Sequence, residues 1–167
     1  MAEVMHFLKR LQTRPTVGAA AAFSLRSFAG PTDIPLWLEL RNRAFARAKP
    51  GILAWNESDM ARELFDRPWW SPDRVWFALA HEPGSDQPVA LGTVALAARA
   101  TAEGEAGAVH WLAVLPAWRR RGVARLLMQA LEERAWNLGY REIYLETHAG
   151  WTGAQRLYEA LQYSRIT

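Results

Sequence analysis

A stretch near the middle of the chain, Ala108 to Ala124, combines features that strongly constrain the fold. It starts as a short apolar strand, passes through a proline-containing turn with three arginines, and reaches a glycine directly before a periodic helix. The first turn of a helix leaves backbone N–H groups without partners, and the helix dipole adds positive charge there. This order of elements predicts an anion site, such as one for phosphate. The turn has neither the Gly-Lys-Ser/Thr of a Walker loop nor the three glycines of a dinucleotide fingerprint.

The composition fits one globular domain. Of 167 residues, 50% are hydrophobic and 22% charged, which suits a buried core and excludes a disordered chain. Cysteine is absent, so disulfides, thiolate nucleophiles and cysteine metal sites are excluded. The net charge is +3, but the tight basic cluster is confined to Arg119–Arg121, and apolar runs stay below the roughly 18 residues of a membrane span. We expect a cytoplasmic protein without metal that binds neither nucleic acid nor membrane.

The first 22 residues carry weaker signals than the rest. Met5, Phe7, Leu8 and Leu11 could form one face of a short helix, and the apolar run 18–22 is too short for a secretory signal. We therefore expect an N-terminal arm or short helix over residues 1–22, followed by a single domain over residues 23–167.

Hydrophobic periodicity divides the remaining chain into strands and helices. Strands are expected at 23–28, 75–80, 88–97, 108–115 and 141–147, and helices at 34–48, 57–66, 122–138 and after the glycine-rich turn 148–153. Residues 75–97 form a hairpin, and 100–107 read as a connection. The strand–helix–strand unit over 108–145 requires parallel strands and a right-handed crossover.

The six residues Arg119-Arg120-Arg121-Gly122-Val123-Ala124 resemble the acetyl-CoA-binding motif of the GCN5-related N-acetyltransferase (GNAT) superfamily, Gln/Arg-x-x-Gly-x-Gly/Ala. A second block, Leu145-Glu-Thr147 followed by Ala154-Gln-Arg-Leu-Tyr-Glu159, is similar to the family's next strand and helix. The resemblance is strong over 108–163 and only topological over 23–97. It implies an α/β (α+β) fold with a mixed, mostly antiparallel central sheet, one parallel splayed strand pair, and helices on both faces.

The resemblance also implies a site for acetyl-CoA as acyl donor. Backbone amides from Arg120 to Ala124 would cradle the pyrophosphate, with Gly122 allowing close approach and arginine side chains adding charge-assisted hydrogen bonds. The pantetheine arm would pair with the preceding strand at Leu112 and Val114, where a backbone amide would polarise the thioester carbonyl. The implied donor-binding residues are Leu112, Ala113, Val114, Arg119, Arg120, Arg121, Gly122, Val123 and Ala124.

The implied reaction moves an acetyl group to a primary amine by direct attack in a ternary complex. Tyr158 matches the family tyrosine that protonates the departing thiolate; the alternative is packing in the apolar stripe of its helix. The base is open, because an alkyl amine with a pKa of about 10 must lose a proton, and Ala108 stands where some members carry glutamate. His110, expected on the same face as Leu112, and Glu146 are candidates. The alternatives are a hydrogen-bonded core histidine, an ion pair or exposed position for Glu146, and a water relay.

Three features depart from the family pattern. Trp151 stands where an asparagine is common, Gln162-Tyr163 replaces Gly-Phe, and Tyr163–Thr167 suffice only for the start of one of the two strands expected after the last helix. The sheet therefore lacks its last strand or strands, or residues 1–22 or a second subunit supply the missing wall. An open sheet edge favours association, so we expect a homodimer. The alternative function is a non-catalytic coenzyme A-binding module, and a weaker one is nucleic-acid binding through Arg119–Arg121.

Nine tryptophans are many for this length. Trp69 and Trp70, in a proline-flanked loop, either line an acceptor pocket or pack on the body of the domain. Trp118 is placed to stack on one of the neighbouring arginines. The acceptor amine itself is not specified by the sequence.

Overall fold

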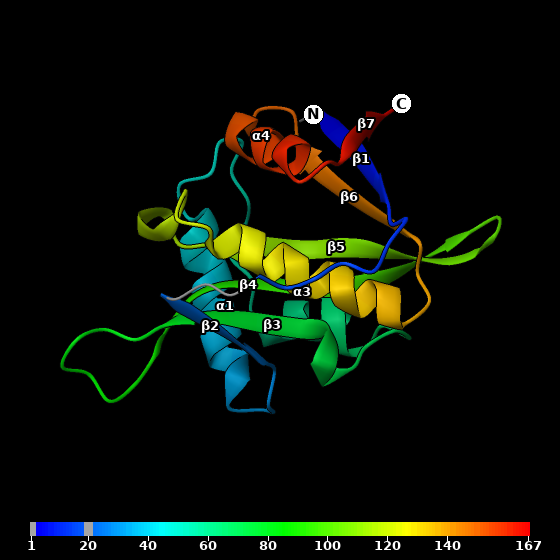
Figure 1. Ribbon diagram of the computed structural model, residues 1–167. Helices are drawn as coiled ribbons and strands as arrows, with labels where there is room; N and C mark the ends of the chain where they lie inside the picture. The colour runs from blue at the N-terminus through cyan, green and yellow to red at the C-terminus, as the bar shows by residue number, and fades with distance from the viewer. Residues whose placement is uncertain (1–2, 19–21) are drawn as a thin grey trace.

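A seven-stranded mixed sheet in the order β2-β3-β4-β5-β6-β1-β7 organises the chain (Figure 1). The computed structural model describes residues 3–18 and 22–167. The strands are β1 (Val4–Arg10), β2 (Phe23–Ser27), β3 (Val75–Ala80), β4 (Val89–Thr101), β5 (Gly104–Val114), β6 (Glu142–His148) and β7 (Ser164–Ile166). The helices are α1 (Asp33–Phe45), α2 (Glu57–Met60), extended by a π-helical turn over Ala61–Phe65, α3 (Val123–Asn137) and α4 (Thr152–Ala160). β5 and β6 pair in parallel and the other neighbours are antiparallel, which confirms the expected fold class.

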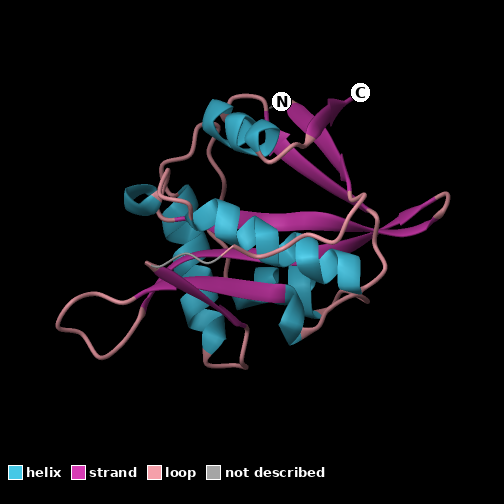
Figure 2. Cartoon of the chain, viewed as in Figure 1, coloured by secondary structure: helices cyan, strands magenta, loops and turns pink. Residues whose placement is uncertain are grey.

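Helices cover both faces of the sheet and bury two apolar cores (Figure 2). The first core lies under α3 and α4, and the second under α1 and α2. Strand β3 serves both, because Trp76 and Ala78 face the first core while Val75 and Phe77 face the second. No helix within the described ranges is long and apolar enough to cross a membrane.

The start of the chain differs from the expected arm or short helix. Val4–Arg10 forms β1, which lies between β6 and β7 and runs antiparallel to both. Met5 and Phe7 are buried while Val4 and His6 are exposed, so the pattern has the two-residue period of a strand. The backbone pairing available beside β6 overrides the apolar spacing that suggested a helix. Val4–Arg10 thus supplies a strand beside β6, as one of the alternatives for the missing wall required.

Side chains and backbone fasten this segment to α3. Lys9 Nζ donates a 2.6 Å hydrogen bond to Glu132 Oε1, and burial raises the pKa of Glu132 while Lys9 opposes that rise. After β1 the chain crosses α3, where the Gly18 N–H donates to Gln129 Oε1 at 2.9 Å (Figure 1). The segment is therefore part of the same sheet and core as the rest of the chain.

Residues 100–107, expected as a connection, belong to the hairpin of β4 and β5. Its turn is held by Thr101 Oγ1, which donates to the Gly104 carbonyl at 3.0 Å, and Gly104 adopts a φ of 129° that favours glycine. Antiparallel pairing extends from this turn to Gly107 and beyond, so sheet pairing overrides the weak strand propensity of alanine and glycine.

Replacing Phe7 by alanine tests whether β1 is integral to the fold. Phe7 is fully buried, so Phe7→Ala should lower the free energy of unfolding by about 3–5 kcal/mol in urea denaturation. Val4→Ala, on the exposed face of the same strand, is the control and should change it by less than about 0.5 kcal/mol. Equal, small effects of both substitutions would show that β1 is not packed in the core.

Candidate functional site

The two parallel strands diverge soon after they meet (Figure 2). Within the described residues, pairing of β5 with β6 is confined to Gly107–Ile143 and Ala108–Tyr144. The cause lies in a bulge on β5: the register against β4 shifts so that two residues, Trp111 and Leu112, occupy the space of one, and Trp111 has a φ of 55°. A bulge bends its strand and increases the twist. The predicted splay of this pair is confirmed.

The bulge leaves backbone groups of β5 directed at the opening. The Leu115 N–H donates to the Leu91 carbonyl in β4 at 2.9 Å, and Ala113 is paired with β4 as well. Val114 lies between these two residues, so its N–H points away from β4, while its carbonyl accepts from Arg119 Nε at 3.1 Å. Leu112 belongs to the bulge and has no partner in β4. Of the three strand residues expected at the donor site, Leu112 and Val114 are thus placed for pairing with a ligand, whereas the backbone of Ala113 is used within the sheet.

The turn after β5 presents the start of α3. Gly122 is the N-cap residue, with a φ of 90°, and no side chain caps the helix. The first N–H groups of α3 therefore lack the side-chain partner that most helix starts have, and the helix dipole places positive charge there. A Cβ on Gly122 would meet nothing within 4 Å, so glycine serves the backbone conformation. Arg120 is also left-handed, with a φ of 63°. The geometry and charge of this turn fit a phosphate group.

The three arginines of the turn differ in what they contact. Arg119 donates from Nε to the Val114 carbonyl at 3.1 Å and from Nη2 to the Ala44 carbonyl at 2.7 Å, which ties the end of β5 to the end of α1. Arg121 lies over the ring of Trp118, 4.9 Å from its centroid, and this confirms the predicted stacking. Arg120 and Arg121 are exposed and add charge beside the helix start. A shallow hollow next to the turn is lined by Arg43, Ala46, Leu115, Pro116, Ala117 and Trp118.

Tyr158 lies in the core between α4 and the sheet. Its ring centroid is 6.1 Å from those of Phe7 and Tyr163, and the side chain is buried. Burial raises the pKa of its hydroxyl well above the ordinary value, so the group stays protonated at neutral pH. Tyr158 therefore packs in the apolar core, as the alternative to a catalytic role predicted. Its hydroxyl also carries the proton that a general acid has to supply.

The two candidate bases occupy different environments. The bulge places both His110 and Trp111 toward α1 and α2, whereas Leu112 packs in the other core, so His110 does not share the face of Leu112 as expected. His110 Nε2 lies 3.9 Å from Glu63 Oε2, and burial lowers its pKa to about 4, with Glu63 opposing. Glu146 is an exposed strand residue, and its carboxylate lies 3.8 Å from His6 Nδ1.

A buried arginine on α1 is the feature that sequence reasoning missed. Arg41 is 1% exposed, and its guanidinium lies over the rings of Trp55 and Trp111, 4.0 and 4.4 Å from their centroids. Its Nη1 donates to the Leu53 carbonyl at 2.9 Å, and burial lowers the pKa of Arg41 to about 10. A signal existed in the sequence, because Arg41 interrupts the apolar stripe of its helix.

Arg41 and its neighbours form what we call the mouth cluster. Its members are Arg41, Phe45, Trp55, His110, Trp111, His148 and Trp151, linked by ring contacts of 4.5 to 6.1 Å and by the cation–π contacts of Arg41. They come from α1, from the loop after it, from β5 and from the β6–α4 turn. That loop also touches the turn, because a Cβ on Gly150 would lie 3.2 Å from Pro50 Cδ. The cluster therefore sits where β5 and β6 separate.

Both tryptophans of the proline-flanked loop pack on the core under α1 and α2, which is one of the two expected roles. Trp70 packs on the body, 4.7 Å from the Phe65 ring and 5.5 Å from Phe28. Trp69 contacts His110 edge-on at 6.1 Å and so borders the mouth cluster.

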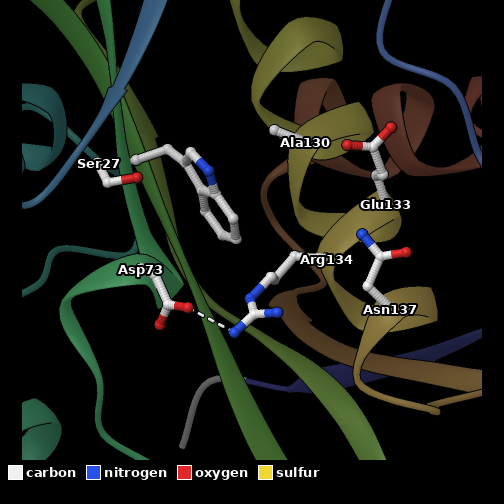
Figure 3. A pocket seen from close by; sticks show the side chains of 7 residues that line it. Ser27, Asp73, Ala130, Glu133, Arg134 and Asn137 are labelled. Atoms are coloured by element: carbon white, nitrogen blue, oxygen red, sulfur yellow. Dashed lines mark hydrogen bonds and ion pairs between the residues drawn. The ribbon is translucent and has the colours of Figure 1, made fainter.

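A second hollow lies at the other end of α3 (Figure 3). It is lined by Ser27, Asp73, Trp76, Ala130, Glu133, Arg134 and Asn137. Arg134 reaches across it to pair with Asp73. Since Arg134 and Asn137 belong to the last turn of α3, this hollow is separate from the helix start at Gly122.

Sequence comparison agrees with this geometry. Residues 36–163 match the acetyltransferase (GNAT) family, and the chain belongs to that family. Mycothiol acetyltransferase of Thermobispora bispora is 33% identical over 144 residues, which cover 86% of this chain and 47% of that protein. The chain spans about half the length of the curated relatives it matches.

Solved structures share the fold. A GCN5-related N-acetyltransferase from Sphaerobacter thermophilus aligns with a TM-score of 0.74 at 22% identity, over 98% of this chain and 48% of that one. A NatC complex bound to Gag peptide and CoA aligns with a TM-score of 0.66 at 18% identity, over 84% of this chain and 83% of that one.

The lowered pKa of His110 can be tested by titration. With a folded-state pKa of about 4, below the unperturbed value of about 6.5, the unfolded chain binds more protons between these two pH values. The stability that neutral His110 confers is therefore complete above pH ~6.5 and falls as the pH drops toward 4. The His110 imidazole resonances, assigned with His110→Asn, should remain those of the neutral ring at pH 5. A midpoint near 6.5 would contradict its burial beside Trp69 and Trp111.

Proposed function

We propose that this chain is an acetyl-CoA-dependent N-acetyltransferase that acts on a primary amine. The observation that carries the proposal is the continuity between the splayed edge of β5 and the uncapped start of α3. An extended pantetheine chain can pair with the edge of β5, and a phosphate group can bind at the start of α3. Membership of the GNAT family and the similarity to mycothiol acetyltransferases support acetyl transfer as the reaction.

The donor half of the site follows from backbone geometry. Leu112, which has no partner in β4, and the N–H of Val114 offer hydrogen-bonding groups for an extra strand. Gly122 and the first amides of α3 face the position of the pyrophosphate, and the exposed Arg120 and Arg121 add positive charge. Arg119 contributes indirectly, because its two hydrogen bonds fix the end of β5 against α1.

The transfer step needs an oxyanion donor and a proton donor. The amine nitrogen attacks the thioester carbonyl carbon, and a backbone amide on the open edge of β5 stabilises the resulting oxyanion; such donors are worth about 2.7–4 kcal/mol each. The carbon–sulfur bond then breaks, the thiolate takes the proton of the Tyr158 hydroxyl, and the proton lost by the amine restores that hydroxyl. Burial keeps Tyr158 protonated at neutral pH, so the proton is present when the thiolate leaves.

Removal of the amine proton is assigned to a water relay. A histidine with a pKa of about 4, such as His110, is a weak acceptor for the proton of an alkylammonium group. Glu146 is exposed and lies beside His6. Both side chains are therefore poorly suited to take the proton of the amine. A relay of water molecules, one of the alternatives open from the sequence, takes that role.

Substitution of Gly122 tests the pyrophosphate site. Gly122→Asp places negative charge and a strained left-handed residue at the helix start and should abolish coenzyme A binding in calorimetric titration. Gly139→Asp is the matched control, because Gly139 has a φ of 89° at the opposite end of α3. It should be similarly strained and yet bind coenzyme A with near-native affinity. Unchanged affinity in Gly122→Asp would exclude this assignment.

Tyr158→Phe separates catalysis from binding. Phenylalanine preserves the packing against Phe7 and removes only the hydroxyl, so coenzyme A affinity should be retained while thiol release from acetyl-CoA falls roughly 10²–10⁴-fold. Tight coenzyme A binding without thiol release from acetyl-CoA, across an amine panel and unchanged in Tyr158→Phe, would instead indicate a non-catalytic coenzyme A-binding module.

A further inference from the structure

Buried polar atoms without a protein partner gather in the mouth cluster. In the described part of the chain, six such atoms belong to its members: Arg41 Nε and Nη2, His110 Nε2, Trp111 Nε1, His148 Nδ1 and Trp151 Nε1. Buried polar groups are nearly always hydrogen-bonded, and each exception calls for an explanation. Their concentration at the place where β5 and β6 separate points to a ligand rather than to scattered packing defects.

These atoms are mainly hydrogen-bond donors. The two Arg41 nitrogens and the two indole nitrogens can only donate, and each imidazole nitrogen can donate in one of its tautomers. Nε and Nη2 form the side edge of the guanidinium, whose two parallel N–H bonds match the two oxygens of a carboxylate. The remaining nitrogen, Nη1, is already used by the Leu53 carbonyl and by Asn42 Oδ1.

Arg41 also lacks a counter-charge in contact. No carboxylate of the described residues lies within 4 Å of its nitrogens. The negative charge of Asp59 attracts Arg41 from a distance and raises its pKa. The Asp59 carboxylate itself accepts hydrogen bonds from the Asn56 N–H at 2.9 Å and from Arg62 at 3.0 Å. A buried cation held only by aromatic faces and carbonyl oxygens is most stabilised by an anionic partner.

The loop between α1 and α2 covers these atoms, and no residue of 46–56 is fully buried. Its main apolar contact is Trp55, whose ring centroid lies 5.9 Å from that of Trp37 and 5.0 Å from that of Trp111. Leu53 on this loop is 85% exposed, and Trp55 is fixed by Asn42, which exchanges two hydrogen bonds of 2.9 Å with the Trp55 backbone. Segments held by few apolar contacts open at low free-energy cost. An acceptor that reaches Arg41 therefore has to lift this loop from the β6–α4 turn and separate Trp55 from Trp111.

We propose that the mouth cluster is the acceptor-recognition site and that Arg41 binds a carboxylate of the acceptor, so that the substrate is an amine that also carries a carboxylate. This inference rests on the proposed acetyltransferase function. The bidentate edge of Arg41 holds the carboxylate, while Trp111 and Trp151 donate further hydrogen bonds from their indoles. The same buried positive charge disfavours polycationic amines.

A binding experiment tests the site without requiring turnover. The probes are L-alanine, β-alanine and 4-aminobutyrate, each paired with its primary amide, which has nearly the same shape without the negative charge. The indole N–H signals of Trp111 and Trp151, assigned by tryptophan-to-phenylalanine variants in the full chain, should shift with at least one of the acids and at least tenfold more weakly with its amide. Signals of Trp76 and Trp136 should stay unchanged. Equal shifts for acid and amide, or no shift of either mouth indole, would overturn the proposal.

A kinetic experiment assigns the effect to Arg41. Thiol release from acetyl-CoA should favour the best acid over its amide by tenfold or more in kcat/KM, consistent with a charged hydrogen-bonded pair. Arg41→Lys keeps the charge and removes the planar edge, and should reduce that preference below about threefold at an unchanged KM for acetyl-CoA. Arg10→Lys, an exposed position on β1 outside the mouth cluster, is the control and should keep the native preference. If Arg41 were only structural, acid and amide would lose activity equally.

The two proposals fail in different ways. Absence of coenzyme A binding and of thiol release with every amine would contradict the acetyltransferase function, while the indole titration would still report on the carboxylate site. Native thiol release that favours the amides over the acids would leave the function standing and overturn the role of Arg41.

Discussion

The bulge at Trp111 and Leu112 is the constraint on which the rest of the site depends. One extra residue on β5 turns the strand away from β6 after two paired positions. That single change opens a row of backbone groups at Leu112 and Val114 and directs His110 and Trp111 toward α1. The unpaired edge of β5 and the mouth cluster are therefore two products of the same irregularity, one on each side of the strand. A regular β5 would pair along its whole length and leave neither.

Rigid surroundings hold this irregular strand in place. Arg119 joins the end of β5 to the end of α1, and Gly92 lies so close to β5 that a Cβ there would be 3.0 Å from the Ala113 carbonyl. On the far side, β1 fills the position beside β6, with Phe7 packed against Tyr158. β5 and β6 are thus each paired along their outer edges, and the gap between them persists because neither can shift toward the other.

Much of this architecture could be predicted from local patterns. The turn Arg119–Ala124, the periodicity of α3 and the parallel crossover follow from residues close in sequence, and so did the expected splay once the motif was recognised. β1 escaped prediction because its partner is far away in sequence, and apolar spacing in seven residues fits a helix or a strand. The face of His110 was wrong for a related reason: simple alternation holds only in a regular strand. Arg41 was not predicted because its burial depends on Trp55 and Trp111, which only the folded chain brings into contact with it.

The position of β1 has a consequence for how the chain folds. Its neighbours, β6 and β7, are both contributed by the opposite end of the sequence, so its pairing closes a loop that contains nearly the entire domain. Contacts of such high sequence separation form late, because the entropy of loop closure must be overcome first. Until then the edge of β6 is open to pairing with other chains. The antiparallel strands β3, β4 and β5 can assemble from nearby residues, and β1 is among the last strands to find its place.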